Sequence, residues 1–129
     1  MRILLVESQI NVRFAVQVLL NQQANLQVVG EAADGSQAVQ LAEQLKPDLV
    51  VMDIAIPGLD GFEAARQIKS RQLTRYVVLL TTQSDSDTRA RAAEVAADAF
   101  VDKSAGSEIL LATIREAYAK LFPNEMRSD

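Results

Sequence analysis

The sequence predicts an α/β protein built on a five-stranded parallel sheet, and three observations support this fold class. Five short apolar runs alternate with segments in which apolar residues recur at helical spacing. Most of these runs are continuously apolar, as expected of strands that helices cover on both faces. No long linker, internal repeat or low-complexity segment interrupts the pattern, and 129 residues suffice for one domain. Such alternation implies right-handed crossovers between parallel strands.

The elements follow one another in strict order along the chain. Strands are expected at the apolar runs 2–6 (RILLV), 26–32 (LQVVGEA), 49–53 (LVVMD), 76–81 (YVVLLT) and 99–102 (AFVD). Helices are expected between them, and their core faces are apolar stripes at spacings of three and four: Val12, Ala15, Val16, Leu19 and Leu20; Ala38, Leu41, Ala42 and Leu45; Phe62, Ala65 and Ile68; Leu110, Ile114, Ala117 and Leu121. Segment 86–95 is mostly alanine and charge, so we expect the fourth helix to be the least stable.

Composition excludes several classes of function. The chain contains no cysteine, hence no disulfide or thiolate chemistry, and no histidine, hence no imidazole base and few options for zinc. A net charge of -4 provides no basic surface for nucleic acid or an anionic membrane. No signal peptide or membrane-spanning run is evident. We therefore expect a cytoplasmic protein that itself binds neither nucleic acid nor membrane.

Polar residues collect where the predicted strands end. Glu7 follows the first strand, Asp53 ends the third, Thr81 ends the fourth and Lys103 follows the fifth. Each has an ordinary structural explanation taken singly; Asp53, for example, can cap the following turn. Since ligands of open parallel sheets bind beyond the carboxyl ends of the strands, together these residues predict a pocket for a metal cation and an anion. Neither glycine-rich nucleotide-binding motif is present.

Residues 1–121 resemble a response-regulator receiver domain, and residues 122–129 are interpreted as a tail or the start of a linker. The resemblance is carried by Glu7, by MDIAIPGLDGFEA around Asp53, by Thr81, and by AFVDK ending in Lys103. The stretch VVGEAADGSQAVQLAEQLKPDLVVMDI resembles receivers of the nitrate-response type, which usually precede a DNA-binding effector domain. The resemblance implies a flavodoxin-like, doubly wound (βα)5 fold with strand order 2-1-3-4-5.

The resemblance also implies a phosphoryl-transfer chemistry. Its nucleophile would be Asp53, which accepts a phosphoryl group from a sensor histidine kinase with Mg²⁺ bound. By the same resemblance, Lys103, the Thr81 hydroxyl and the Thr82 amide would interact with the phosphoryl oxygens. The metal ligands would be Glu7, Asp53 and the Ala55 carbonyl. Thr81 and Phe100 would act as the switch that remodels the face formed by helix 4, strand 5 and helix 5, through which a homodimer is possible. No enzymatic activity is implied beyond self-phosphorylation and self-dephosphorylation.

Two positions depart from the family pattern. Receivers usually carry two acids after the first strand, whereas this chain has Glu7-Ser8. Ser8 can hold only a metal-bound water, so we expect weakened Mg²⁺ affinity. Ala96 stands where glycine usually ends the fourth helix.

The sequence leaves three functions open. The leading one is a phosphorylation-controlled switch. The alternative is a degenerate receiver that binds partners without phosphorylation, which the Glu7-Ser8 pair favours. The third, an unrelated small α/β enzyme using Asp53, is disfavoured by the absence of histidine and cysteine.

Overall fold

The computed structural model describes residues 1–82 and 85–125, in which five strands alternate with five α-helices. The elements are β1 (Arg2–Val6), α1 (Ile10–Asn21), β2 (Gln27–Ala32), α2 (Gly35–Leu45), β3 (Leu49–Asp53), α3 (Gly61–Ser70), β4 (Tyr76–Thr81), α4 (Ser86–Glu94), β5 (Ala99–Asp102), a short 3-10 helix η1 (Lys103–Ala105) and α5 (Ser107–Leu121). The predicted strands are confirmed, with one shift of a residue. Leu26 lies in the turn after α1, where its N–H donates to the carbonyl of Gln23, so β2 begins at Gln27.

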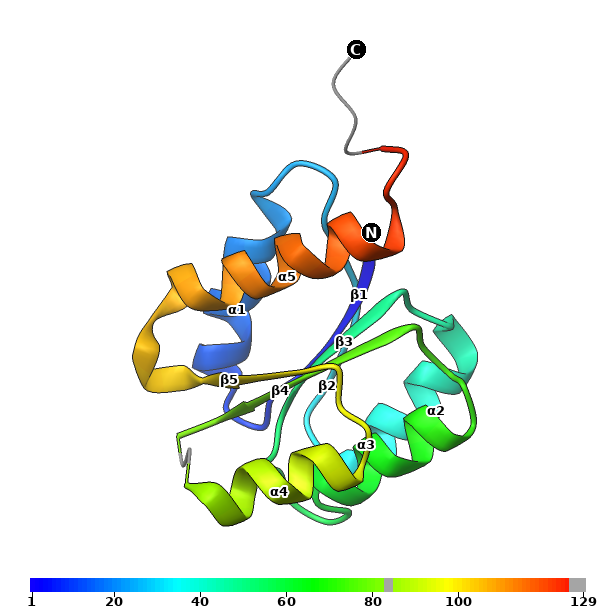
Figure 1. The fold of residues 1–129 in the computed structure, drawn as a ribbon, viewed down its shortest axis with the longest axis vertical. Helices are drawn as coiled ribbons and strands as arrows, with labels where there is room; N and C mark the ends of the chain where they lie inside the picture. Colours follow the sequence, from blue (N-terminus) through cyan, green and yellow to red (C-terminus); the bar gives the residue numbers. More distant parts are fainter. Residues whose placement is uncertain (83–84, 126–129) are drawn as a thin grey trace.

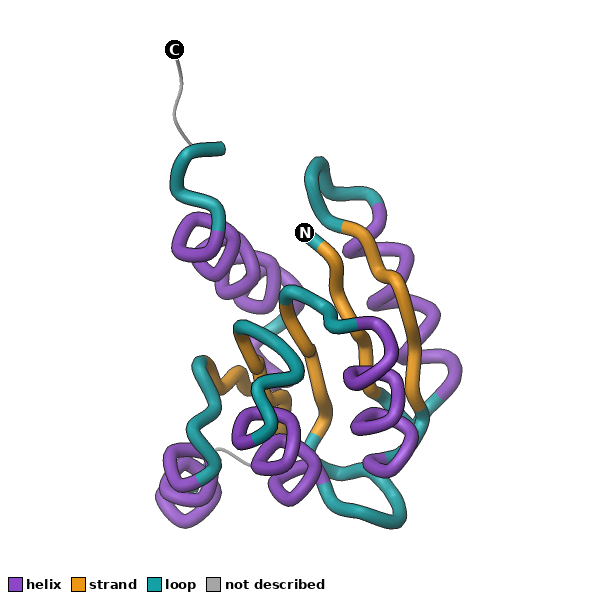
Figure 2. Tube along the Cα trace, turned by 90° about the vertical axis from the view of Figure 1, so that its right-hand side faces the viewer, coloured by secondary structure: helices purple, strands orange, loops and turns teal. Residues whose placement is uncertain are grey.

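All four strand pairs are parallel, and the strands lie in the order β2-β1-β3-β4-β5. Helices α1 and α5 cover one face of the sheet, and α2, α3 and α4 cover the other (Figure 1). The view turned by 90° shows the strands between these two helical layers (Figure 2). The predicted fold class and strand order are therefore confirmed. No helix in the described residues is both long and apolar enough to cross a membrane.

The continuously apolar strands divide their side chains between two cores. In β1, Leu4 and Val6 pack toward α2, α3 and α4, whereas Ile3 and Leu5 pack toward α1 and α5. The same division holds in β3 and β4, because successive side chains of a strand point to opposite faces. A strand buried on both faces needs no polar alternation, which is why these runs contain none.

Helix α1 departs from its predicted core face. Leu20 is fully buried, and Val16 packs against the core cluster on the α5 side of the sheet, as the periodicity predicts. Ala15, which belongs to the same predicted stripe, is exposed instead. The assignment of Ala15 to the core was wrong because apolar residues lie on all sides of this helix, so the spacing alone did not define its inner face.

Two Asp-Gly pairs begin the helices that follow β2 and β3. Asp34 and Asp60 each accept a hydrogen bond from a backbone N–H of the first turn, at 2.8 and 2.9 Å. The glycines allow close approach: a Cβ on Gly61 would lie 2.4 Å from the Cα of Ile54. The start of α3 is thereby packed directly against the backbone that follows Asp53.

The residues after α5 fold back on the domain as far as the structure describes them. The centres of the Phe122 and Tyr118 rings lie 5.2 Å apart, and the Arg75 guanidinium lies 5.5 Å from the centre of the Phe122 ring. The Tyr118 hydroxyl bonds the Glu125 carboxylate. The predicted boundary at residue 121 coincides with the end of α5, but the assignment of the following residues to a tail or linker stays a prediction, and 126–129 lie outside the described residues.

Helix α4 ends in a Schellman motif with alanine at the position that normally takes glycine. Ala96 has φ 62°, its N–H donates to the carbonyl of Ala93, and the N–H of Ala97 donates to the carbonyl of Ala92. The left-handed conformation expected there is therefore present, and a Cβ in this region is strained.

Ala96→Gly is expected to raise the free energy of unfolding by about 1 kcal/mol, because glycine adopts positive φ without that strain. Urea denaturation measures the change. Ala90→Gly provides the matched control, since Ala90 is an exposed alanine in the interior of the same helix, where glycine should destabilise by about 1 kcal/mol. Destabilisation by both substitutions would contradict the assignment of strain to Ala96.

Candidate functional site

The candidate site lies at the carboxyl edge of the sheet, where the strand order reverses. Strand β1 is flanked by β2 on one side and β3 on the other, so successive crossovers leave in opposite directions at this point. Glu7 directly follows β1, and Asp53 is the last residue of β3. Both acids are almost fully buried, with 3% and 5% of their surface exposed. Buried carboxylates are costly unless they are paired, so their partners define the site.

A single lysine pairs with both acids. The Lys103 Nζ atom donates to Glu7 Oε1 at 2.8 Å and to Asp53 Oδ2 at 2.6 Å. The remaining carboxylate oxygens accept backbone hydrogen bonds, Glu7 Oε2 from the Gln9 amide at 3.0 Å and Asp53 Oδ1 from the Ala55 amide at 2.9 Å. Two buried negative charges thus share one ammonium group, which leaves the cluster with a net charge of about -1.

The two carboxyl groups respond differently to this environment. Burial alone would raise the pKa of Glu7, but the Gln9 amide and the Lys103 ammonium outweigh it, so that pKa is lowered. For Asp53, burial prevails over the hydrogen bonds from Lys103 and Ala55, and the charge of Glu7 adds to it, so the pKa is raised. Burial would lower the pKa of Lys103, yet its two carboxylate partners raise it. Lys103 therefore stays charged at neutral pH.

An arginine that sequence reasoning missed supports the site from α1. The Arg13 guanidinium donates to the backbone carbonyl of Glu7 at 2.7 Å and lies 3.4 Å from the Glu31 carboxylate. It fixes the backbone at the end of β1 against the start of α1 and the end of β2. One signal was available in the sequence, because Arg13 is the sole charged residue of the first helix.

The other predicted site residues lie around this cluster. Thr81 ends β4 with 2% of its surface exposed, and β4 lies directly beside β3. Thr82 and Ala55 are exposed, and Ser8 is half-buried beside Glu7. The structure therefore brings Glu7, Asp53 and Lys103 into contact, whereas Ser8, Ala55, Thr81 and Thr82 are placed at the same edge of the sheet.

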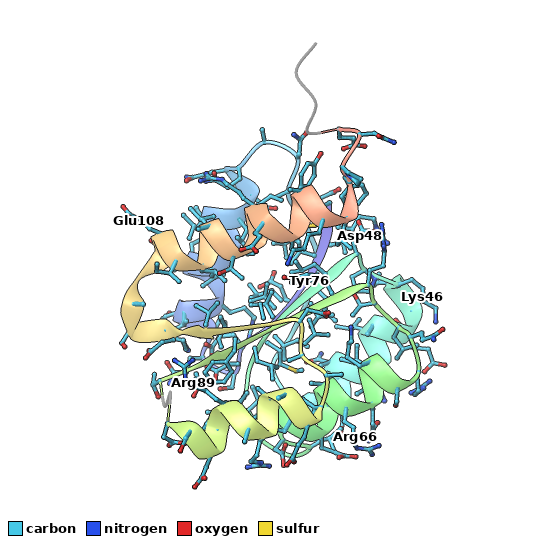
Figure 3. The ribbon with its side chains drawn as sticks, in the orientation of Figure 1. Lys46, Asp48, Arg66, Tyr76, Arg89 and Glu108 are labelled. Atoms are coloured by element: carbon cyan, nitrogen blue, oxygen red, sulfur yellow. The ribbon has the colours of Figure 1, made fainter. Side chains whose placement is uncertain are left out.

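Phe100, the predicted switch residue, is half-buried on the edge strand β5. The Arg89 guanidinium of α4 lies 5.7 Å from the centre of its ring, a cation–π distance. Figure 3 shows Arg89 between the beginning of α4 and the sheet. The neighbouring Arg91 lies 4.2 Å from the ring of Phe62, which connects α4 to α3. Helix α4, in which only Thr88 and Ala92 are buried, is thus held partly by arginine–aromatic contacts.

The oxygen donors at the site suit a hard divalent cation. Glu7, Asp53 and the Ala55 carbonyl supply the oxygen ligands that Mg²⁺ prefers, and Mg²⁺ is commonly held by one or two carboxylates with water and phosphate oxygens. However, the described residues contain no cluster of three or more acidic, histidine or cysteine side chains that could hold a metal. The donors available for Mg²⁺ are thus two carboxylates and one carbonyl, and an ion bound there would share its carboxylates with Lys103.

Known proteins match this chain over most of its length. Residues 3–115 match the response regulator receiver domain family. The chain is 34% identical to the transcriptional regulatory protein LiaR of Bacillus subtilis over 116 residues, which are 90% of this chain and 55% of LiaR. It is 31% identical to the nitrate/nitrite response regulator protein NarL of Escherichia coli over 117 residues, which are 91% of this chain and 54% of NarL. The chain thus spans about half the length of the curated relatives it matches.

Solved structures agree with this match. A two-component response regulator of the LuxR family from Aurantimonas sp. SI85-9A1 superposes with a TM-score of 0.85 at 32% identity, over 92% of this chain and 85% of that chain. The response regulator domain of Thermotoga maritima CheB superposes with a TM-score of 0.82 at 32% identity, over 91% of this chain and 95% of that chain. Sequence, topology and the clustered acid–lysine site all lead to one conclusion: the chain belongs to the response regulator receiver domain family.

Proposed function

We propose that this chain is a phosphoacceptor switch in which Asp53 receives a phosphoryl group from the phosphohistidine of a sensor histidine kinase. The observation that carries the proposal is the contact of Lys103 with both Asp53 and Glu7 at the carboxyl edge of the sheet. Receiver domains are generally non-enzymatic signalling modules of two-component systems, so the chemistry proposed for this chain is limited to its own phosphorylation and dephosphorylation.

The side chains supply what phosphoryl transfer to a carboxylate requires. An Asp53 oxygen forms a bond to phosphorus while the bond between phosphorus and the imidazole nitrogen of the donor breaks. The electron pair of the broken bond stays on that nitrogen. A carboxylate needs no general base for this attack. The Lys103 ammonium neutralises charge on the transferring group, and the Thr81 hydroxyl and Thr82 amide donate hydrogen bonds to its oxygens.

Receiver domains typically bind Mg²⁺ for phosphorylation. In this chain Glu7, Asp53 and the Ala55 carbonyl would hold the ion, with Ser8 contributing through water. When bound, Mg²⁺ adds positive charge that stabilises the transferring phosphoryl oxygens. With one acid fewer than the family pattern, Glu7 and Asp53 have to hold the ion largely by themselves, which supports weak binding.

The output of the switch is proposed to be the face of α4, β5 and α5. When a phosphoryl group engages Thr81 and Lys103, Phe100 changes its position on β5. The Arg89 contact with the Phe100 ring couples that change to α4, which buries only Thr88 and Ala92 and otherwise contacts its neighbours through arginine–aromatic pairs. Association of two copies through this face, a cytoplasmic location and a DNA-binding effector domain in the full-length protein stay predictions.

The proposal is tested by intact mass spectrometry after incubation with acetyl phosphate and Mg²⁺. We expect a gain of one phosphoryl group, which EDTA prevents and which reverses on standing as the acyl phosphate hydrolyses. Absence of any mass gain with acetyl phosphate, together with absence of transfer from phosphorylated histidine kinases, would contradict it.

A second candidate function is a receiver that binds its partner without phosphorylation. The specific observation in its favour is that all four carboxylate oxygens of Glu7 and Asp53 already accept a hydrogen bond from the protein. In that case Lys103 serves as the permanent counterion, and partner binding is the same with and without the phosphodonor.

Ser8→Asp is expected to increase Mg²⁺ affinity, because it adds a carboxylate beside Glu7 and Asp53. A third acid also repels its neighbours, so the metal-free variant should melt below the wild type and show a larger Mg²⁺-dependent rise in melting temperature. A Mg²⁺ titration followed by thermal unfolding measures both effects. The conservative control is Ser8→Asn, which adds a similar volume without charge. Equal titrations for wild type and Ser8→Asp would show that the missing acid does not limit metal binding.

A further inference from the structure

Each polar group of Glu7 is held by a partner from another part of the chain. Its N–H donates to the Ala32 carbonyl at 3.0 Å, and its carbonyl accepts from the Arg13 guanidinium at 2.7 Å. Its two carboxylate oxygens accept from the Lys103 ammonium at 2.8 Å and from the Gln9 amide at 3.0 Å. The side chain of Arg13 thus holds the main chain of the residue whose carboxylate lies in the candidate site.

A closed ring of hydrogen bonds joins Glu7, Gln9 and Arg13. The Arg13 guanidinium donates to the carbonyl of Glu7, and the Arg13 N–H donates to the carbonyl of Gln9 at 2.9 Å. The N–H of Gln9 donates in turn to the carboxylate of Glu7. Because each of these bonds joins two residues that the other two bonds also hold, the grip of Arg13 on a backbone carbonyl is transmitted to the Glu7 side chain.

Arg13 stands where its charge does not favour its own helix. It lies in the first turn of α1, where a positive charge is unfavourable to the helix dipole. That turn contains no acidic residue that could offset the charge. The Glu31 carboxylate of β2, 3.4 Å away, does so instead, and only 18% of the Arg13 side chain is exposed. The tertiary contacts of Arg13, and not local helix stability, therefore account for its place in the sequence.

The orientation of Glu7 matters more here than in a site with two acids after β1. Ser8 beside it carries no carboxylate, so the position of one side chain decides what this strand end offers to a cation. Glutamate has one rotatable bond more than aspartate, and fixing a side chain costs conformational entropy. A carboxylate that the protein already holds in place avoids that cost when a ligand binds. Residues that orient a metal ligand typically change metal affinity by about 10- to 100-fold when they are replaced.

We propose that Arg13 is a positioning residue that acts through Glu7. It keeps the Glu7 carboxylate oriented for Mg²⁺, and Glu31 holds the Arg13 guanidinium in place. The inference rests on the proposed function, because it takes Glu7 as a ligand of the ion. The contact of Arg13 is with the backbone of Glu7, so its effect comes from orientation and not from neutralising the carboxylate.

The charge of Arg13 and its positioning role have opposite effects on Mg²⁺ affinity. A positive charge repels a divalent cation, so removing the charge alone would tighten Mg²⁺ binding. Breaking the ring of hydrogen bonds frees the Glu7 side chain and weakens Mg²⁺ binding. A residue that merely attaches α1 to the sheet would change the stability of the protein and leave the affinity for Mg²⁺ as it is.

A Mg²⁺ titration of Arg13→Met, followed by thermal unfolding without any phosphodonor, distinguishes these roles. Methionine keeps part of the apolar stem of arginine but neither its charge nor its donors. We expect the dissociation constant for Mg²⁺ to rise about tenfold relative to the wild type. With acetyl phosphate, the rate of phosphorylation should fall more at low Mg²⁺ than at saturating Mg²⁺.

Arg13→Lys is the conservative variant. It keeps the positive charge but lacks the planar fork that reaches the Glu7 carbonyl and the Glu31 carboxylate together. Its dissociation constant should lie between those of the wild type and Arg13→Met. Circular dichroism checks that both variants are folded, and Arg13→Lys carries the test if Arg13→Met does not fold.

Glu31→Gln tests the second half of the proposal. We expect it to weaken Mg²⁺ binding less than Arg13→Met does, because the Glu7 carbonyl still holds the guanidinium. In the double variant with Arg13→Met, the substitution of Glu31 should have no further effect, since residues that act through one contact are not additive. Full additivity of the two substitutions would overturn the role assigned to Glu31.

Arg2→Met is the matched control. Arg2 lies at the opposite end of β1, where its guanidinium also donates to a backbone carbonyl at 2.7 Å, that of Leu45. It should keep the Mg²⁺ affinity of the wild type. Unchanged or tighter Mg²⁺ binding by Arg13→Met would overturn the proposal, and so would equal weakening by Arg2→Met or a wild type whose unfolding does not respond to Mg²⁺. The titration decides this inference without phosphorylation, whereas the mass gain of the wild type decides the proposed function, so failure of one is distinguishable from failure of the other.

Discussion

Asp53→Asn is expected to abolish the phosphoryl mass gain, since it removes the sole carboxylate that ends β3 at the reversal of strand order. Asparagine preserves the shape of the side chain and can keep a hydrogen bond to the Ala55 amide, but its amide is not a nucleophile for phosphorus. We expect no modified protein by intact mass spectrometry after an incubation that phosphorylates the wild type. A gain at the wild-type rate would refute the assignment of Asp53.

Asp60→Asn is the matched control for this variant. It makes the same chemical change at an exposed aspartate of the same loop, and asparagine caps a helix about as well as aspartate. Phosphorylation of Asp60→Asn should equal that of the wild type. A loss in both variants would point to the loop conformation and not to the nucleophile.

The stability of Asp53→Asn provides an independent measurement. Because the pKa of Asp53 is raised in the folded protein, ionisation of this group opposes folding above its ordinary value of 3.8. Removing the charge should therefore leave the melting temperature at pH 7 equal to or above that of the wild type. The advantage should fade as the pH falls and Asp53 of the wild type becomes protonated. A strongly destabilised variant would contradict the prediction that ionised Asp53 opposes folding.

Lys103→Met is expected to lower the free energy of unfolding at neutral pH by about 3 kcal/mol, because it leaves two buried carboxylates without their shared cation. Methionine keeps most of the volume and the apolar part of the lysine side chain. Urea denaturation measures the loss. The variant should also respond weakly to phosphorylation, since the group that joins the phosphoryl site to β5 is gone.

Lys69→Met is the control for Lys103→Met. It also removes a paired lysine, but the partner of Lys69 is a partly exposed carboxylate instead of two buried ones. The Lys69 and Lys103 side chains are similarly exposed, at 22% and 24%, but Lys69 pairs with Asp98, whose side chain is 28% exposed. Partly exposed pairs contribute about 1 kcal/mol or less, so this control should lose far less stability. Equal losses in the two variants would show that burial of Glu7 and Asp53 is not the cause.

The penalty of Lys103→Met should depend on pH in a defined window. The raised pKa of Lys103 means that its stabilisation is fully present below its ordinary value of 10.5 and is lost as the pH rises through the folded value. On the acid side, the penalty should shrink as Asp53, whose pKa is raised, and then Glu7, whose pKa is lowered, become protonated. The difference between variant and wild type is therefore expected to be largest around neutral pH.

The sheet could be predicted from the sequence because local signals and tertiary burial agree there. The inner strands β1, β3 and β4 are short apolar runs between polar turns, and nearly all of their side chains are buried whichever helix layer they meet. Asp53 was recognisable for a related reason, as a charge at the end of such a run. The order of the strands was not encoded locally; it came from resemblance to receiver domains, since spacing alone does not say on which side of β1 a later strand lies.

Helix α1 shows where local signals fail. Because this helix has apolar residues on all its sides, the spacing of Val16 and Leu20 did not distinguish its buried face from the exposed face around Phe14. Ala15, which is exposed, was therefore assigned to the buried face. Only packing against the sheet selects the buried face. Periodicity therefore predicts that a helix forms, but it does not predict which face of the helix packs against the sheet.

By itself, the sequence determined which elements form and that Glu7, Asp53 and Lys103 reach one edge of the sheet. Only the tertiary structure decided that a single ammonium group bridges both acids across separations of 96 and 50 residues, and that Arg13 holds the backbone of Glu7. The physical reason is that secondary structure follows from interactions between near neighbours in the chain. The charge balance of a buried site depends instead on distances of a few ångströms between residues that only the folded sheet brings together.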